Sequence, residues 1–309
     1  LGSLLFGRVR DDIGAWVGLF GSKNAFAAVA AGLAICSIAL LLDRSASRLL
    51  RLAALAGLLS AGPVLVLAQS VGTMTIVLPA IAVAAVIMAS RRMSGGQKVL
   101  AAIVVALVAV IGSMLLIVHG EALFANYLEF SGKDVTLTGR TDLWDVGRDL
   151  IGENPWLGLG YQAFWVQGNE MAEVLWAMFD IDARKGFNFH NTYINNAVEI
   201  GLVGVGLQVL LFYGAFFGVI GWALRAPCPE NAFLAAFLAF LIAGSFIEVV
   251  VFFQFSIASI VAVAAFVYAS RYREWRREST RFSEPLRVTG DLMRLPRHPG
   301  SGQAWGARP

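Results

Sequence analysis

Seven long, nearly uncharged apolar segments are the feature that most constrains this chain. They lie near residues 25–42, 52–69, 74–90, 99–118, 193–223, 231–247 and 251–270. About 20 helical residues cross the hydrocarbon core of a bilayer, where every backbone polar group needs a partner, so each segment is predicted to be a transmembrane helix. Only 15% of the 309 residues are charged, against roughly 25% in a soluble chain. The mean hydropathy is +0.69. We therefore predict an all-α polytopic integral membrane protein with about seven transmembrane helices.

Basic residues in the connections predict the orientation. They follow the first, third, fifth and seventh segments, as Arg44, Arg48 and Arg51, then Arg91, Arg92 and Lys98, then Arg225, then Arg271, Arg273, Arg276, Arg277 and Arg281. All of these groups lie on one side if every segment spans, and the positive-inside rule makes that side the cytoplasm. The opposite, extracytoplasmic face then carries residues 1–24, a long loop at 119–192 and the turn near Ser245–Glu248.

Two regions are expected in the chain. Residues 1–270 form a membrane-embedded domain that includes the extracytoplasmic loop 119–192. Residues 271–309 are basic, then rich in Pro, Gly and Arg, and are predicted to be a disordered cytoplasmic tail near anionic headgroups. Because the basic residues adjoin a span, membrane lipids are the expected partners and nucleic acid is not. The chain begins with Leu1, so upstream spans could be missing.

The long loop is expected to be ordered, because three of its segments mix apolar and charged residues at helical spacing. These are residues 121–130, 141–152 and 170–181. Thr141 is predicted to cap the second helix, with Asp142 in its first turn and Asn154-Pro155 ending it.

The side chains best suited to catalysis lie where the loop meets the next apolar segment. His190 stands there, followed by Asn191, Tyr193, Asn195 and Glu199. Ionisable groups at membrane depth are costly and usually functional. The sequence has two cysteines, no metal-ligand spacing of His, Asp and Glu, and no nucleotide-binding glycine loop. Arginine forks bind phosphate oxygens, and a neutral imidazole accepts protons near neutral pH. These parts can hold a pyrophosphate and deprotonate a hydroxyl without a metal or a cofactor.

Three motifs give the chain a family resemblance. They are the loop-to-helix entry at 18–27, the stretch 137–144 that continues to 154–160, and His190-Asn191 followed by Gly201-x-x-Gly204. In this order the chain resembles the O-antigen ligase/polymerase superfamily of bacterial membrane glycosyltransferases, especially its exopolysaccharide polymerase-like branch. The resemblance implies transfer of a glycan from an undecaprenyl pyrophosphate carrier to a sugar hydroxyl. It further implies inversion without a metal, at the outer (periplasmic) face of the bacterial inner membrane.

The resemblance also assigns roles. The family's histidine falls on His190, which would accept the proton of the attacking hydroxyl, and its long-loop arginine falls on Arg140, which would hold the diphosphate with Lys23. Related polymerases often have a basic residue and a histidine where this chain has Val17 and Ser22. Arg8 and Arg10 are therefore candidates for the missing charge. Asn191, Tyr193, Asn195 and Glu199 are expected to support the site or bind the acceptor.

Several alternatives stay open from the sequence. Five aromatic residues of the loop predict either a surface that stacks on sugars or contacts lipid, or an ordinary belt at the membrane interface. They are Trp156, Tyr161, Phe164, Trp165 and Trp176. Gly201, Gly204 and Gly206 are read as sites of close helix packing. A transporter or flippase for lipid-linked glycans, or a non-catalytic assembly subunit, is the alternative to an enzyme. Expected partners are the lipid-linked glycan, a glycan or lipid acceptor and other polysaccharide assembly proteins. The sequence leaves open the sugar, the linkage, the oligomeric state and the choice between ligase and polymerase.

Overall fold

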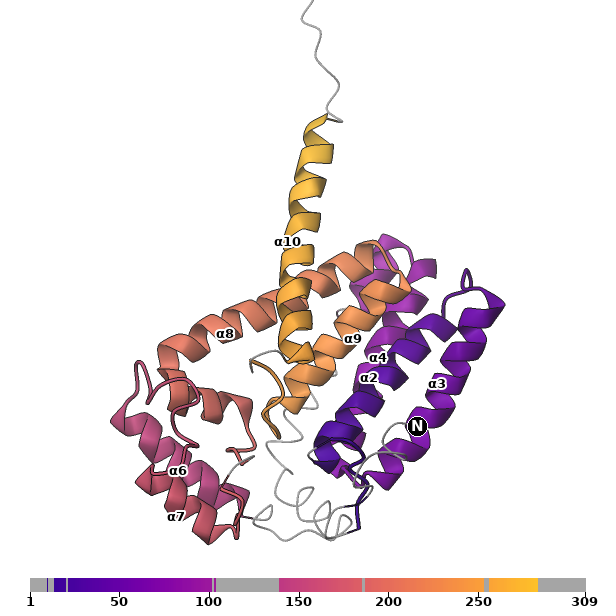
Figure 1. The fold of residues 1–309 in the computed structure, drawn as a ribbon. Helices are drawn as coiled ribbons and strands as arrows, with labels where there is room; N and C mark the ends of the chain where they lie inside the picture. The colour runs from indigo at the N-terminus through magenta and orange to yellow at the C-terminus, as the bar shows by residue number, and fades with distance from the viewer. Residues whose placement is uncertain are drawn as a thin grey trace, which may run out of the picture. The chain divides into compact units, whose positions relative to one another are not determined.

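The computed structural model describes residues 10, 14–20, 22–101, 103, 139–184, 187–252 and 256–282, with side chains up to residue 272. Within these ranges every regular element is a helix (Figure 1), and the chain is an all-α polytopic membrane protein. The chain divides into two units, residues 1–270 and 271–309. All of the site described below lies in the first unit.

The first helices form an alanine-rich bundle. α2 (Lys23–Leu41) packs against α3 (Arg48–Leu67), α4 (Val71–Ala89) and α9 (Pro229–Gly244), and a short 3-10 turn, η1 (Ser90–Arg92), follows α4. The helices run alongside one another in Figure 1. Their contact is lined by small side chains such as Ala31, Ala34 and Ala235, which are at most 2% exposed. Small residues allow helix axes to approach closely, and such packing holds helices together where the surrounding lipid is equally apolar.

Four described helices are long and apolar enough to cross a bilayer: 23–41, 48–67, 71–92 and 192–225. They correspond to four of the predicted spans. The predicted spans 231–247 and 251–270 fall on shorter apolar helices, α9 and the first part of α10 (Ile257–Phe282). Residues 251 and 252 are not helical, since Phe252 has φ of 70°. The span predicted at 99–118 lies outside the described residues beyond 103.

A small second core supports the loop region between the spans. Its buried side chains come from α6 (Arg140–Glu153), α7 (Glu170–Met178), the start of α8 (Thr192–Arg225) and the loops that hold Phe164 and Phe189. These are Leu143, Leu150, Phe164, Ala172, Leu175, Trp176, Phe189 and Val198. Two of the three helices predicted in the loop are therefore present, and the one predicted at 121–130 lies outside the described residues.

The predicted cap of α6 is wrong by two positions. The helix already begins at Arg140, and Gly139 occupies the N-cap position with φ of 78°, without a side-chain cap. Thr141 therefore lies inside the first turn. Glycine adopts this left-handed conformation readily, and a side chain there would collide with the ring of Phe179. The shift matters because it places Arg140 at the very start of the helix.

α8 is broken at Gly201, a feature that the glycine spacing did not predict. Gly201 has φ of 67°, and a Cβ there would overlap the backbone of Trp156. The loop after α6 fills the break. Leu202 and Val203 donate backbone hydrogen bonds to the carbonyls of Pro155 and Trp156, and Leu159 and Gly160 donate to the carbonyls of Val198 and Glu199. Gly201 thus serves a loop–helix contact, whereas Gly206 has open space beside it.

Basic connections meet at one end of the membrane helices. Arg91 donates to the Asp43 carboxylate at 3.0 Å and to the carbonyl of Pro227 at 2.9 Å. Lys98 donates to the carbonyl of Leu224. The side-chain hydrogen bond from Ser45 and the nearby Arg91 hold the pKa of Asp43 below its ordinary value. The connections after α2, α4 and α8 therefore lie together, as the predicted orientation requires.

Candidate active site

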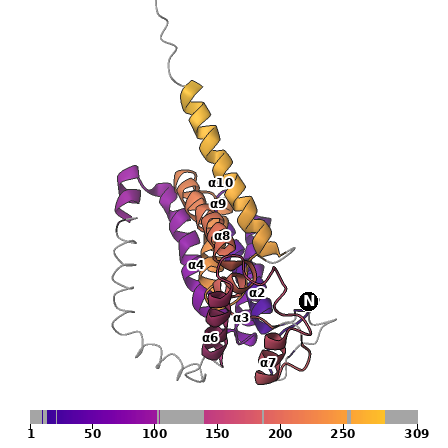
Figure 2. The same cartoon turned by 90° about the vertical axis from the view of Figure 1, so that its left-hand side faces the viewer.

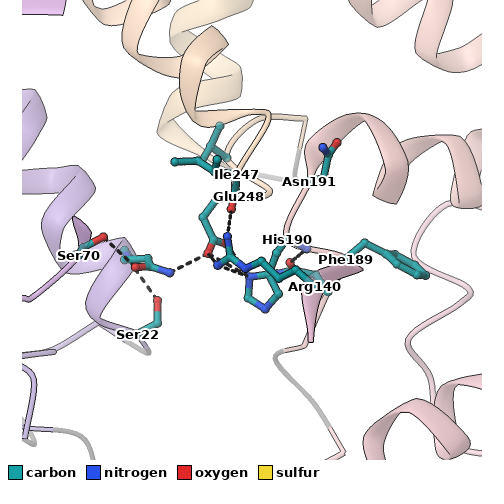
Figure 3. A network of polar contacts seen from close by, with 12 residues as sticks. Ser22, Ser70, Arg140, Phe189, His190, Asn191, Ile247 and Glu248 are labelled. Carbon is teal, nitrogen blue, oxygen red and sulfur yellow. Dashed lines mark hydrogen bonds and ion pairs between the residues drawn. The ribbon is translucent and has the colours of Figure 1, made fainter. Parts of the chain in front are cut away.

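The opposite end of the same helices holds a polar network centred on Glu248 (Figure 3). Its carboxylate accepts hydrogen bonds from Asn24, Arg140 and His190, at 2.7 Å, 3.0 Å and 3.0 Å respectively. These side chains come from the starts of α2, α6 and α8, so Glu248 joins three segments that are far apart in the sequence. The side chain of Glu248 is only 19% exposed.

Arg140 is fixed from two directions because it is the first residue of α6. One of its amino groups donates to the carbonyl of Ile247 at 2.8 Å, and the other donates to Glu248 at 3.0 Å. Its side chain is 21% exposed. An arginine fork held in this way keeps further N–H donors for an anionic oxygen. The predicted phosphate-binding residue is thus fixed in place, with part of its surface open.

His190 sits on a constrained backbone immediately before α8. Its φ is 48°, a left-handed conformation that costs on the order of 1 kcal/mol for a residue with a Cβ. Its N–H donates to Oδ1 of Asn188 at 2.7 Å. The next residue, Asn191, caps α8 by accepting from the N–H groups of Tyr193 and Ile194. The neighbouring contacts thus offset the strain and fix the direction of the imidazole.

The network selects a tautomer for His190. Nδ1 lies 3.0 and 3.1 Å from the two carboxylate oxygens of Glu248 and 3.4 Å from an Arg140 nitrogen. A carboxylate accepts and a guanidinium only donates, so the shorter contacts require that Nδ1 carries a proton. The Arg140 nitrogen then donates to Glu248 instead. In the neutral ring Nε2 is therefore the acceptor, and it points away from Glu248 in Figure 3.

The charge of Glu248 is stabilised by its partners. Burial by itself raises the pKa of this carboxyl, but the His190 hydrogen bond, the charges of His190 and Arg140 and the Asn24 hydrogen bond outweigh it. The net pKa lies below the ordinary value of 4.5. Asn24 is itself oriented, because its Oδ1 accepts from the hydroxyl of Ser70 at 2.8 Å. A proton gained by His190 would thus be balanced by an adjacent negative charge.

Two cavities adjoin this network. The smaller, of about 220 Å³, is lined by Lys23, Asn24, Arg140, Leu143, Phe179, Phe187 and His190. The larger, of about 590 Å³, is mainly apolar and runs between α2, α4 and α9. Its apolar lining includes Ala28, Val29, Ile76, Phe233, Phe237, Phe240 and Ile257. Asn24 lines both cavities, so an amphipathic ligand could have its polar part near Arg140 and its apolar part among the helices.

Three of the predicted site residues lie together, and Arg10 lies elsewhere. His190, Arg140 and Lys23 line the small cavity together. Arg10 instead lies over the ring of Trp16, with its guanidinium carbon 5.9 Å from the ring centroid, and Arg8 is outside the described residues.

The residues expected to support the site act through the backbone and through each other. Asn191 caps α8 and donates to the carbonyl of Phe246, and the Tyr193 hydroxyl is hydrogen-bonded to that of Tyr213. Asn195 and Glu199 are buried, and Asn195 donates to the Glu199 carboxylate at 3.3 Å. Glu199 also accepts from the N–H of Gln162, which fastens the loop that fills the break in α8. These contacts position the loop and the start of the helix.

The predicted aromatic surface is divided. Phe164 and Trp176 are at most 2% exposed and belong to the small core, and Trp165 packs against Phe164 and Phe189. Trp156 and Tyr161 are exposed beside the break in α8. The aromatic rings that do reach the small cavity, Phe179 and Phe187, were not among the predicted residues.

Sequence reasoning missed Glu248 and Asn24 as members of the site. Glu248 was recognisable as a carboxylate beside apolar segments, where a charged group needs a partner. The partner could not be predicted from the sequence, because His190 lies 58 positions away from Glu248 in the chain. Asn24 lies within the 18–27 motif, but no role was assigned to it, because a polar residue at a helix start is ordinary.

Comparisons with known proteins agree with the second and third motifs. A family model described as O-antigen ligase matches residues 58–209. The exopolysaccharide production protein ExoQ of Rhizobium meliloti (strain 1021) is 43% identical over 129 residues, which is 41% of this chain and 30% of that relative. The aligned part is thus about a third of the relative's length.

Proposed function

Because the chain belongs to the O-antigen ligase/polymerase superfamily, we propose that it transfers a glycan from a polyprenyl diphosphate carrier to a sugar hydroxyl, as a polysaccharide polymerase. The observation that carries the proposal is the Arg140–Glu248–His190 network, which combines an anion-binding fork with an oriented base. The network lies at the end of the helices away from the basic connections, so the reaction is proposed to occur at the periplasmic face of the inner membrane.

The proposed step is a displacement at the anomeric carbon. The acceptor hydroxyl oxygen forms the new bond to that carbon while the bond to the phosphate oxygen breaks, and the polyprenyl diphosphate leaves with the electron pair. Nε2 of His190 takes the hydroxyl proton, and Glu248 stabilises the resulting imidazolium. Arg140 and Lys23 are suited to the charge that develops on the leaving diphosphate. A positioned base of this kind accelerates a reaction by about 10²- to 10⁴-fold.

The larger apolar cavity supports a lipid-linked donor. Its walls are mostly aliphatic and aromatic, while Ser22, Asn24 and Glu248 lie among its polar lining. A polyprenyl chain placed there would have its diphosphate near Asn24, which also lines the cavity that holds Arg140 and Lys23. In this arrangement the carrier remains in the membrane during transfer. The printed name of the relative, an exopolysaccharide production protein, favours polymerisation over ligation to a lipid core.

Proteoliposomes containing the purified full chain and the lipid-linked glycan test this proposal. The expected products are glycans of more than one repeat and free polyprenyl diphosphate, separated by mass. His190→Ala should remove transfer while leaving membrane insertion intact. Arg140→Lys should lower the initial rate at least about ten-fold, because an ammonium cannot replace two hydrogen bonds of a planar fork.

Arg148→Lys is the matched control on the same helix, since Arg148 is 63% exposed and pairs with Asp145. It should retain the wild-type rate. An unchanged glycan that only crosses the bilayer would identify a transporter. A single transfer to a non-glycan lipid acceptor would identify a ligase. Normal transfer by His190→Ala would exclude the proposed base.

A further inference from the structure

The small cavity beside His190 has two chemically different walls. One is polar and cationic, formed by Lys23, Asn24, Arg140 and His190. The other is apolar and formed mainly by two phenylalanine rings, Phe179 and Phe187. A diphosphate needs only the first wall, and the carrier lipid has the larger apolar cavity available to it. The rings therefore leave an apolar surface that neither the diphosphate nor the carrier lipid needs.

Both rings are held from behind. Trp165 packs edge-on against Phe187 at 5.1 Å between ring centroids, and Phe179 packs against Phe187 at 5.4 Å. Gly139 leaves the space that the Phe179 ring occupies, because a Cβ there would come within 2.5 Å of it. Both phenylalanines are nevertheless only half-buried. Together they form an aromatic surface that keeps part of its area exposed and lines the cavity.

The His190 imidazole lies beside this aromatic surface and determines which part of a bound ligand can react. The rings of Phe187 and His190 are 5.7 Å apart between centroids and inclined at 78°. A sugar ring has apolar C–H groups on its faces and hydroxyls on its rim. C–H groups carry slight positive charge and are attracted to the negative face of an aromatic ring. A sugar on the phenylalanine wall would thus direct a rim hydroxyl toward the base.

We propose that Phe179 and Phe187 form the subsite for the sugar ring of the acceptor that carries the attacking hydroxyl. This inference rests on the proposed glycan transfer and names its acceptor side. The cavity of about 220 Å³ is below the range of roughly 300–1,000 Å³ found for drug-sized ligands, so most of the acceptor glycan would lie outside it.

Three of the four residues expected to support the site or bind the acceptor are engaged in other contacts. Asn191 is occupied by the helix cap, and Asn195 and Glu199 are buried next to the loop that fills the break in α8. Recognition of the acceptor through its apolar ring face also tolerates different hydroxyl patterns. Specificity for one hydroxyl would then come from the distance to His190.

Three variants of the full chain in proteoliposomes test the subsite. Phe187→Leu keeps apolar bulk but removes the ring face, Phe187→Tyr keeps the ring, and Phe217→Leu is a matched control on the exposed side of α8. The acceptor probe is the free oligosaccharide released from the lipid-linked donor by acid hydrolysis. Phe187→Leu should raise the KM for this probe about two- to ten-fold, which corresponds to the energy of one aromatic contact. The KM for the lipid-linked donor should stay within two-fold, and Phe187→Tyr and Phe217→Leu should resemble the wild type.

A binding measurement separates this inference from the proposed reaction. In the His190→Ala background, calorimetric titration with the same oligosaccharide should show weaker binding when Phe187→Leu is added. If the wild type transfers no glycan but this weakening is seen, the reaction is wrong and the sugar subsite stands. An unchanged probe KM, or an equal rise in the donor KM, overturns the subsite. If Phe187→Leu is not monodisperse, Phe179→Leu replaces it under the same criteria.

Discussion

Replacing Glu248 with glutamine is the most informative perturbation of the network. The carboxylate accepts from Arg140 and from Nδ1 of His190, each at 3.0 Å. Once His190 has taken a proton, its charge lies 3.4 Å from the Arg140 nitrogen. Two unit charges at this distance repel by about 5 kcal/mol at an effective dielectric constant of about 20, and Glu248 supplies an attraction of similar size.

The side chains are about one fifth to one quarter exposed, so water screens part of this interaction. We expect roughly half of it to be lost from the transition state in Glu248→Gln, about 2.5 kcal/mol, which is an about 70-fold slower reaction. Glutamine can also present its amide N–H₂ to Nδ1 and favour the wrong tautomer. Glu248→Asp should recover part of the rate, because the charge remains but the reach is shorter.

The assay is the initial rate of glycan transfer in proteoliposomes, with saturating lipid-linked donor. Glu170→Gln is the matched control, because Glu170 is exposed in the first turn of α7. Size-exclusion chromatography and thermal unfolding in detergent check that the variant is folded. A folded Glu248→Gln protein with at least one third of the wild-type rate would refute the charge-balance argument for His190.

Two further predictions concern stability. Gly201→Ala should lower the unfolding free energy by about 1–3 kcal/mol, because φ is 67° and the new Cβ would overlap Trp156. Gly206→Ala is the control and should be neutral, because there is open space beside Gly206. Equal shifts in the unfolding temperature of the two variants would contradict the backbone argument. The pKa of Glu248 is lowered from its ordinary value of 4.5, so its stabilising effect is present above that pH and is lost as pH falls through the lower folded-state value. Acidification below 4.5 should therefore destabilise the wild type more than Glu248→Gln in thermal unfolding, and parallel pH curves would contradict it.

The membrane helices were predictable because their signal is local. An apolar run of about 20 residues specifies a span whatever surrounds it, and α2, α3, α4 and α8 follow the predicted segments closely. The start of α10 was not predictable in this way. Residues 250–252 are as apolar as the helix that begins at Ile257, so hydropathy cannot distinguish an apolar connection from a span.

The site was predictable only where a motif marked it. His190 was marked by its place at the start of an apolar segment and by the family resemblance, Arg140 by the resemblance, and the structure brings them together. Their link through Glu248 depends on three chain segments meeting, which no local pattern encodes. The break at Gly201 is similar, because its cause is the carbonyl of Trp156, 45 positions earlier in the chain. Glycine spacing alone suggested helix packing.

α2 lies beside α4 and α9 (Figure 2), and the three partners of Glu248, which are Asn24, Arg140 and His190, come from segments far apart in the sequence. A chain caught midway through insertion has a histidine without its oriented tautomer and an arginine without its anchor. The geometry of the network is therefore coupled to completed folding of the chain.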